Sequence, residues 1–307
     1  MISSIIMIAG CICLGIAYQV LPRVPSPALV RAWIGRVVLW LLLPALAFRA
    51  LWSASANETT VWQVPLIAAT CCVACLLLAW LFYRHRLERP TLGAMLYASA
   101  WSNVTYLGIP ILTAIVGSHA VRYAVLYDVM ALTPLLFTVG AAIGIVYGDK
   151  GHRPTVGAML MQLITLPPLI AAAAGLVAGH AQLWLPSFVV GILDVSSALV
   201  APLMLVSVGM ALRVPRALAF ARSAPAAIIT LVVSPCLAWI LARYVVHMPL
   251  DVATAVTLEA GMPSMILPMV FAERYGLDLH ALAEAIVITT AISAITLPII
   301  ATLAGAL

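Results

Sequence analysis

Long runs of apolar residues, separated by short stretches that contain charged residues, proline or glycine, fill the sequence from one end to the other. A helix needs about 20 mainly apolar residues to cross the roughly 30 Å hydrocarbon layer of a membrane. We place ten such spans at residues 2–21, 29–52, 61–83, 91–117, 121–147, 155–179, 186–212, 223–246, 251–272 and 279–304. The pattern predicts an all-α integral membrane protein. We expect the first run to be a span rather than a cleaved signal peptide, because no basic residue precedes it.

The composition excludes several classes of protein. Of the 307 residues, 65% are hydrophobic and 8% are charged, whereas an average soluble domain has roughly 25% charged residues. So few ionisable side chains cannot cover the surface of a soluble protein of this length. We therefore exclude a soluble enzyme and a nucleic-acid-binding protein, and expect a multi-pass protein of the cell inner membrane with the lipid bilayer around it.

The formal net charge of +5 becomes informative once the basic residues are sorted by connection. The connections after spans 1, 3, 5, 7 and 9, with the adjoining helix ends, hold twelve of the fifteen: Arg23, Arg31, Arg36, Arg84, Arg86, Arg89, Lys150, Arg153, Arg213, Arg216, Arg222 and Arg274. The other side holds Arg49, Arg122 and Arg243. Because basic residues remain cytoplasmic, both termini are expected outside, in the periplasm of a Gram-negative host.

Prolines inside the spans reveal a repeat. Pro44 and Pro110, in spans 2 and 4, are 66 residues apart, and Pro202 and Pro268, in spans 7 and 9, have the same spacing. The offset between the two pairs is 158 residues. This recurrence predicts two copies of one five-span unit.

The two repeats are predicted at residues 1–147 and 155–307, joined by a short cytoplasmic connector at 148–154. Because each repeat has an odd number of spans, the second enters the membrane from the opposite side. An inverted repeat of this kind is typical of secondary transporters, whose binding sites lie at interrupted helices near the middle of the bilayer.

The fourth span of each repeat is the candidate for an interrupted helix. Span 4 contains Gly108 and Pro110, and span 9 contains Gly261, Pro263 and Pro268. Proline removes a backbone hydrogen bond and clashes with the preceding turn. The alternative is a simple kink, since glycine and proline are common in membrane helices.

An interrupted helix offers a site for an anion. Its freed N–H groups need partners in hydrocarbon, and a helix N-terminus carries about half a positive charge, so a carboxylate needs no buried lysine or arginine there. The candidate substrate-binding residues are Ser102, Asn103, Thr105, Gly108, Pro110, Pro263, Ser264 and Pro268. For Asn103 the alternative is a hydrogen bond that holds two helices together.

Three acidic residues lie inside spans: Asp128, Asp194 and Glu259. An ionised group at the centre of a membrane helix costs roughly 2.5–3.5 kcal/mol, so each is expected to be protonated, paired or facing water. They are candidates for proton or cation coupling, or for polar support of an interrupted backbone. Glu284, near the cytoplasmic end of span 10, is expected to reach the interface, as are Arg49 and Arg243. The alternative for these two arginines is attraction of anions at the outer mouth.

The remaining reactive residues indicate no other chemistry. All six cysteines fall inside apolar spans, which predicts packing rather than a metal site. No HExxH motif or other paired catalytic set occurs within the spans. We therefore expect no enzyme activity, no catalytic residue, no cofactor and no metal.

Four segments carry a resemblance to a known family. They are NVTYLGIP (103–110), PSMILPMVFAERY (263–275), VGMALRVP (208–215) and LLPALAF (42–48). Together they resemble the auxin efflux carrier family, which includes the plant PIN-type carriers. The similarity is specific at the first two segments and looser elsewhere, although all ten spans correspond.

The resemblance implies a fold shared with bile-acid symporters and sodium/proton antiporters. In that fold helices 4 and 9 break and cross in a transport domain of helices 3–5 and 8–10, while helices 1, 2, 6 and 7 form a scaffold that makes a homodimer. The long cytoplasmic loop of the plant carriers has no counterpart at 148–154. Bacterial members are commonly assigned to malonate, malate or related acids.

The sequence thus predicts a secondary transporter that moves a small organic anion by alternating access at the crossover of helices 4 and 9. The substrate would be a mono- or dicarboxylate such as malonate or malate, or an auxin-like acid, and coupling to protons, to sodium or to neither stays open. The alternative is a membrane receptor or regulatory subunit that binds a small carboxylate without moving it.

Overall fold

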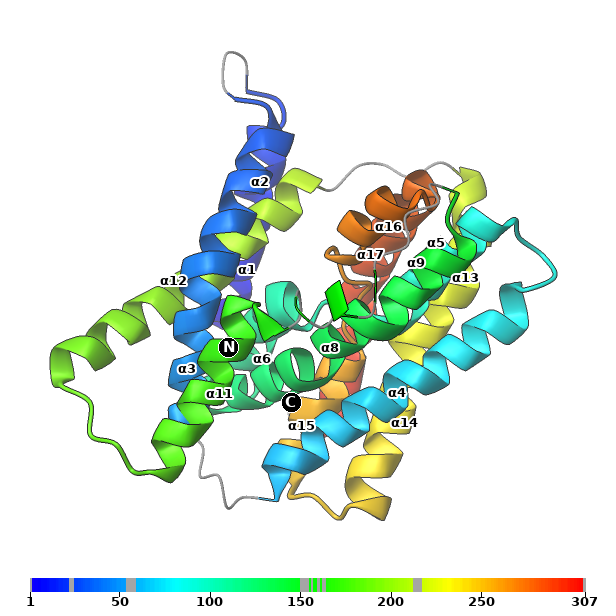
Figure 1. The fold of residues 1–307 in the computed structure, drawn as a ribbon. Coiled ribbons are helices and arrows are strands. Elements are labelled where there is room, and N and C mark those ends of the chain that lie inside the picture. The colour runs from blue at the N-terminus through cyan, green and yellow to red at the C-terminus, as the bar shows by residue number, and fades with distance from the viewer. Residues whose placement is uncertain are drawn as a thin grey trace. The chain divides into compact units, whose positions relative to one another are not determined.

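The computed structural model describes residues 2–21, 25–53, 59–149, 155, 157–158, 161, 164–211 and 217–305. Within these ranges the regular elements are all helical, and the extended pairing is limited to one isolated bridge between Ser102 and Ser264 (Figure 1). The all-α prediction is therefore confirmed. The predicted connector lies outside the described residues from 150 to 154, as do Arg23, Arg213 and Arg216.

Among the residues that the structure describes, six helices are long and apolar enough to cross a membrane: Leu29–Trp52, Thr60–Tyr83, Ser118–Tyr147, Ser187–Met210, Ala219–Val245 and Leu279–Leu303. Two further apolar helices, Val104–Ile115 and Pro167–His180, are shorter. A multi-pass membrane protein is thus supported, whereas the count of ten spans and their inverted repeat stay predictions.

The α-helices in chain order are α1 (Ile2–Tyr18), α2 (Pro27–Val37), α3 (Leu43–Trp52), α4 (Thr60–Tyr83), α5 (Arg89–Ala100), α6 (Ile109–Ile115), α7 (Val121–Tyr127), α8 (Thr133–Leu135), α9 (Ala141–Tyr147), α11 (Pro167–His180), α12 (Ser187–Ala211), α13 (Ala217–Ile228), α14 (Ser234–Ile240), α15 (Leu250–Ala260), α16 (Pro268–Tyr275) and α17 (Leu279–Leu303). A 3-10 turn, η3 (Ser118–Ala120), precedes α7. Wider π-helical turns join several of these helices: η1 (Val38–Leu42), η2 (Val104–Gly108), η4 (Asp128–Leu132), η5 (Leu136–Gly140), η6 (Ile229–Val233) and η7 (Leu241–Val245).

Four of the π-helical turns have a common cause. η1, η2, η4 and η6 each end two residues before a proline, namely Pro44, Pro110, Pro134 and Pro235. A proline ring has no N–H and clashes with the carbonyl of the preceding turn, and the wider π turn makes room for it. These prolines therefore modify a helix without interrupting it.

The chain divides into two compact units, each built from both halves of the sequence. Unit 1 comprises Met1–Val61, Thr105–Val125 and Ile164–Arg213, and unit 2 comprises Trp62–Val104, Leu126–Leu163 and Val214–Leu307. In unit 1, α1 packs against α12, and α11 packs against α3.

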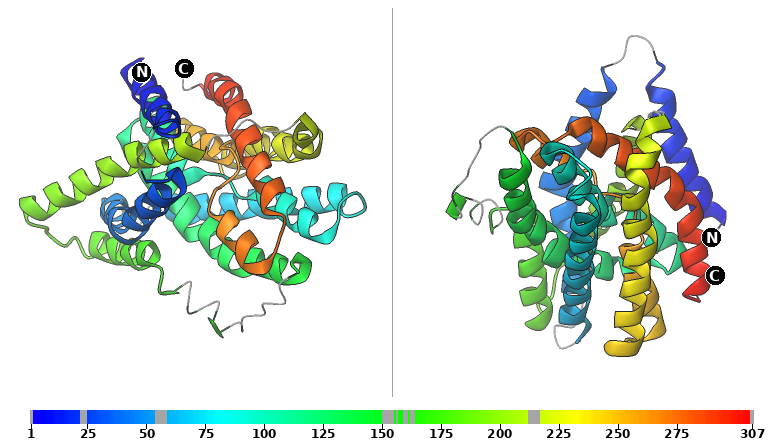
Figure 2. Two further views of the ribbon diagram at one scale, coloured as in Figure 1. Left: turned by 90° about the horizontal axis from the view of Figure 1, so that it is seen from above. Right: turned by 90° about the vertical axis from the view of Figure 1, so that its right-hand side faces the viewer.

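In unit 2, α4 lies beside α14 and η6 (Figure 2). The thiols of Cys71 and Cys75 lie 3.9 and 4.0 Å from the carbonyl oxygens of Ser234 and Ile229. All six cysteines are free, and these two are buried.

Two helices of unit 2 are buried on every side. Residues 92–100 of α5 and residues 252–260 of α15 are all buried. A helix that is apolar or small all round belongs in the interior of a bundle. Both helices lead directly into the non-helical segments that follow them, so those segments are held inside the unit.

The contact between α1 and α12 depends on two glycines. A Cβ atom added at Gly209 would lie 2.2 Å from the carbonyl oxygen of Ile12 and 3.0 Å from the Cα of Gly15. Close backbone approach at small residues is a main source of stability between membrane helices.

We therefore expect Gly209→Ala to lower the thermal unfolding midpoint of the purified protein, at a cost of about 1–3 kcal/mol for overpacking. Gly191→Ala is the matched control, because it lies in the same helix and its added Cβ would meet no atom within 4 Å. The control should unfold at the wild-type temperature or slightly above it, since alanine favours a helix over glycine. Equal midpoints for both variants would contradict this packing.

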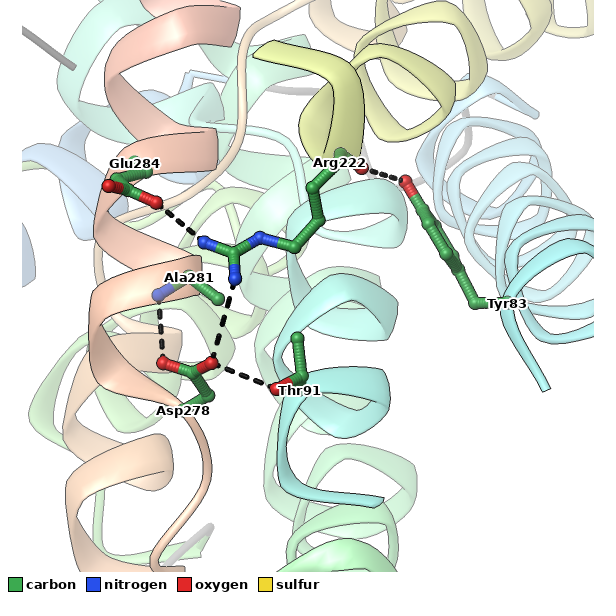
Figure 3. Close-up of polar contacts among 6 residues, drawn as sticks. All are labelled: Tyr83, Thr91, Arg222, Asp278, Ala281 and Glu284. Carbon is green, nitrogen blue, oxygen red and sulfur yellow. Dashed lines mark hydrogen bonds and ion pairs between the residues drawn. The ribbon is translucent and has the colours of Figure 1, made fainter. Parts of the chain in front are cut away.

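A polar network ties four helices together at one end of unit 2 (Figure 3). The Arg222 guanidinium pairs with Glu284 at 2.5 Å and with Asp278 at 3.9 Å. Tyr83 donates to the carbonyl oxygen of Arg222 (2.7 Å), and Thr91 donates to Asp278 (2.9 Å). Glu284 is therefore paired with an arginine, rather than reaching alone to the interface.

Because Arg222, Glu284 and Asp278 are all partly buried, replacing the arginine leaves two carboxylates without their cation. We expect Arg222→Gln to lower the unfolding midpoint, by the equivalent of about 1–3 kcal/mol. Adding Glu284→Gln to it should cost little more, because the interaction is already lost. Arg86→Gln, which removes an exposed arginine next to Phe82, is the control. Additive effects of the Arg222 and Glu284 substitutions would contradict the pairing.

Candidate functional site

Two interruptions of helical backbone meet inside unit 2. The first separates α5 from η2 at residues 101–103, and the second separates α15 from α16 at residues 261–267. The Asn103 N–H donates to the carbonyl oxygen of Pro263 (2.7 Å), and the Met265 N–H donates to that of Trp101 (2.8 Å). Backbone groups left unpaired in hydrocarbon cost several kcal/mol each. Each interruption therefore supplies hydrogen-bond partners for backbone groups of the other.

One serine from each interruption forms a hydrogen bond to the helix that leads into the other interruption. Ser264 donates to the carbonyl oxygen of Ala98 in α5 (2.5 Å), and Ser102 donates to that of Ala260 in α15 (3.4 Å). Carbonyl groups in the last turn of a helix have no intrahelical partner. The hydroxyls supply that partner, which fixes Ser102 and Ser264 opposite one another.

A threonine of α17 completes the setting of Ser264. The hydroxyl of Thr289 accepts from the N–H of Ser264 (3.1 Å), and its single proton lies within reach of the Ser264 hydroxyl oxygen (3.1 Å) and of the Ala285 carbonyl oxygen (2.8 Å). Ser264 and Thr289 are fully buried. Sequence reasoning did not identify Thr289, because a single hydroxyl in an apolar span usually bonds to its own helix, as Thr289 also does with Ala285.

Beside this paired backbone lie buried polar atoms that have no hydrogen-bond partner among the described residues. They are Oδ1 of Asn103, both carboxylate oxygens of Glu259 and Oγ1 of Thr257. Asn103 is 2% exposed and Glu259 is 0% exposed. Buried polar groups are rarely left unpaired, and each exception calls for an explanation such as a ligand, an ion or a functional role.

Asp128 joins this polar group from η4. It is buried, accepts a hydrogen bond from Thr133 (2.9 Å), and lies within electrostatic range of Glu259. Two of the three acids singled out in the sequence are thus close together in unit 2.

The structure distributes the other predicted residues over both units. Ser102, Asn103, Pro263, Ser264 and Pro268 belong to unit 2, and Pro268 is the first residue of α16. Thr105, Gly108 and Pro110 belong to unit 1.

The sequence predicted the first interruption at Gly108 and Pro110. In the structure it lies several residues earlier, at residues 101–103. Gly108 and Pro110 lie in the continuous helix Val104–Ile115, because the π turn accommodates the proline ring. The second interruption lies between Gly261 and Pro268.

Asp194 has a specific partner in unit 1. Its Oδ1 accepts a hydrogen bond from Nε of Arg49 at 2.8 Å, and the two side chains are 54% and 29% exposed. The sequence placed these residues in spans 2 and 7 without pairing them. The signal available was that each is an isolated charge within an apolar span, which favours a partner of opposite sign.

Comparison with known proteins places this geometry in context. A family model described as membrane transport protein matches residues 27–143 and 153–301. An uncharacterized transporter of Methanocaldococcus jannaschii is 26% identical over 270 residues, with 85% of each chain covered. A second uncharacterized transporter, from Methanothermobacter thermautotrophicus, is 29% identical over 278 residues, covering 87% of this chain and 86% of the relative.

Proposed function

Because the chain belongs to the membrane transport protein family, the auxin efflux carrier family that its motifs resemble, we propose that it is a secondary transporter of a small organic anion. The observation that carries this proposal is the pair of interrupted helices in unit 2, joined by backbone hydrogen bonds beside the buried Asn103 side chain. The family is one of membrane transporters rather than of enzymes.

The proposed binding site uses neutral groups to hold a negative charge. A primary amide carries two N–H donors and one acceptor, which exchange places when the side chain turns over. Asn103 can therefore donate to a carboxylate and remain uncharged when the site is empty. An arginine or lysine in its place would cost several kcal/mol inside a membrane.

The two compact units support a mechanism of alternating access. Unit 1 includes the described residues of predicted spans 1, 2 and 7, and unit 2 includes those of spans 8, 9 and 10 and of span 3 from Trp62 onward. In the proposal, the first is the scaffold and the second moves against it, which exposes the site to each side of the membrane in turn. Residues 105–125 cluster with unit 1, so spans 4 and 5 link the two units.

Glu259 is the proposed coupling residue. An ionised carboxylate buried in a membrane without a partner is costly, so the side chain has to hold a proton or a cation. Asp128 adds a second carboxyl group nearby, which raises the cost of a second negative charge. A carboxyl group that binds its cation on one side of the membrane and releases it on the other couples anion transport to the cation gradient.

Flux through proteoliposomes tests the proposal. The purified protein is reconstituted, and uptake of labelled malonate, malate, a monocarboxylate and an indole acid is compared with that of empty liposomes. We expect protein-dependent uptake of at least one acid. Binding without uptake would support the alternative of a receptor, and neither binding nor uptake of any acid by folded protein would contradict the proposal.

A further inference from the structure

Unit 1 contains a cavity of about 630 Å³, and Pro110 is the candidate substrate-binding residue that lines it. Its walls come from α3, α6, η3, the start of α7 and α12, and all lining residues belong to unit 1. Sites for small ligands usually have volumes of about 300–1,000 Å³. The cavity is therefore large enough for a metabolite-sized molecule.

The charged groups in this cavity favour an anion. Arg49, Arg122, Asp194 and His119 all line it, and two arginines less one aspartate give a formal net charge of +1 with the histidine counted as neutral. Arg49 and Arg122 are also two of the three basic residues that the charge count assigns to the outer side. The cavity is thus predicted to open outward, where it would meet an anion first.

The hydrogen bond between Arg49 and Asp194 leaves most of the guanidinium available. Arg49 uses Nε for this bond, and among the described residues its two Nη groups make no hydrogen bond that competes with a ligand. A guanidinium binds a carboxylate through two parallel N–H donors. Ion pairs between exposed side chains contribute only about 0–1 kcal/mol, and Asp194 is more than half exposed. A second carboxylate can therefore replace Asp194 at little cost.

Apart from Ser118 and His119, the rest of the lining is mostly apolar or has its hydroxyls bonded to backbone. Leu46, Ile109 and Val121 contribute apolar side chains. The hydroxyls of Thr113 and Ser197 donate to carbonyl oxygens of their own helices, at 2.7 Å each. Such walls suit the body of an apolar molecule better than a second charged group.

We propose that this cavity is a capture site for an organic anion that has one carboxylate and an apolar body, and that the anion replaces Asp194 as the partner of Arg49. The inference rests on the proposed transport function for its class of ligand and deepens it by favouring monocarboxylates over dicarboxylates. Asp194 acts as an internal competitor that neutralises Arg49 in the absence of the anion.

Calorimetric titration of the full-length protein in detergent tests this site. The probes are phenylacetate, malonate and phenylacetamide, which has the apolar body of phenylacetate without the charge. We expect phenylacetate to bind more tightly than malonate, and phenylacetamide not to bind. Failure of the wild-type protein to bind phenylacetate, or equal binding of phenylacetamide, would overturn the proposal.

Two substitutions should change binding in opposite directions. Arg49→Gln should weaken phenylacetate binding about tenfold, because a hydrogen bond to a charged group is lost. Asp194→Asn should tighten it about threefold, because a competing surface charge is removed. The same variant should gain more affinity for malonate than for phenylacetate, since the formal charge of the cavity rises from +1 to +2. Equal weakening by both substitutions would indicate a structural ion pair and overturn the proposal.

Arg36→Gln is the matched control, since it removes an exposed arginine of unit 1 that stacks on Trp33 outside the cavity. It should bind phenylacetate as the wild type does, and a tenfold loss there would also overturn the proposal. Should Arg49→Gln fail to fold, the tightening expected of Asp194→Asn alone decides the outcome. Binding that follows these expectations without flux in proteoliposomes would refute transport but not the capture site. Flux with binding unchanged in both variants would refute the capture site alone.

Discussion

Replacing Asn103 with alanine should lower the rate of organic anion uptake roughly 10- to 100-fold while leaving the protein folded. The side chain is buried beside the paired backbone of the two interruptions, and its Oδ1 has no partner among the described residues. A hydrogen bond to a charged group contributes about 1.5–3 kcal/mol, which corresponds to this change in rate if the bond holds the substrate. The N–H of residue 103, which donates to Pro263, is unaffected by the substitution.

The measurement is initial uptake into proteoliposomes, with the thermal unfolding midpoint as the check on folding. Ser99→Ala is the control, because Ser99 is buried in α5, the helix that leads into the interruption at Asn103, but its hydroxyl donates to Met95 of its own helix (2.7 Å). The control should transport at close to the wild-type rate. Wild-type uptake by the Asn103→Ala variant would remove this residue from the binding site.

The second large effect is expected from Glu259→Gln, which keeps the size of the side chain but cannot take up or release a proton. If Glu259 couples transport, an imposed pH gradient should no longer drive accumulation of the anion by this variant. Exchange of labelled for unlabelled anion at equal concentrations should persist, since it needs no net movement of the coupling ion. The measurement compares gradient-driven uptake with exchange in the same proteoliposomes.

Asp251→Asn provides the matched control, since Asp251 is an exposed acid in the first turn of the same helix, α15. It should keep the response to the gradient. A sodium gradient is tested in parallel. The coupling ion is the one whose gradient drives accumulation by the wild type but not by Glu259→Gln. A Glu259→Gln variant that still accumulates anion in response to the gradient would contradict the coupling role.

The sequence predicted those features that depend on composition and on local backbone chemistry. The apolar runs indicated membrane helices, and the interruption between Gly261 and Pro268 lies where the two prolines predicted it. The first interruption was misplaced towards Gly108 and Pro110, because proline chemistry alone cannot distinguish a break from a π-helical turn. Which of the two forms depends on the packing around the helix.

Pairings between distant segments could not be predicted. The hydrogen bond between residues 103 and 263 depends on the register of two segments that are 160 positions apart. The pairing of Arg49 with Asp194 and the contact of Thr289 with Ser264 are of the same kind. Arg49, Asp194, Ser264 and Thr289 are polar residues in apolar spans, which signals that each needs a partner. A single sequence does not identify that partner.

Counterflow distinguishes a carrier that works by alternating access from a channel or a receptor. Proteoliposomes are loaded with an unlabelled acid that the flux screen has identified, and diluted into medium with a trace of the labelled acid and no ion gradient. A carrier should accumulate the label transiently above its external concentration, because each outward step with unlabelled acid returns the site for an inward step with label. Uptake that rises only to equilibrium would indicate a channel, and no uptake a receptor, and either result would contradict the account.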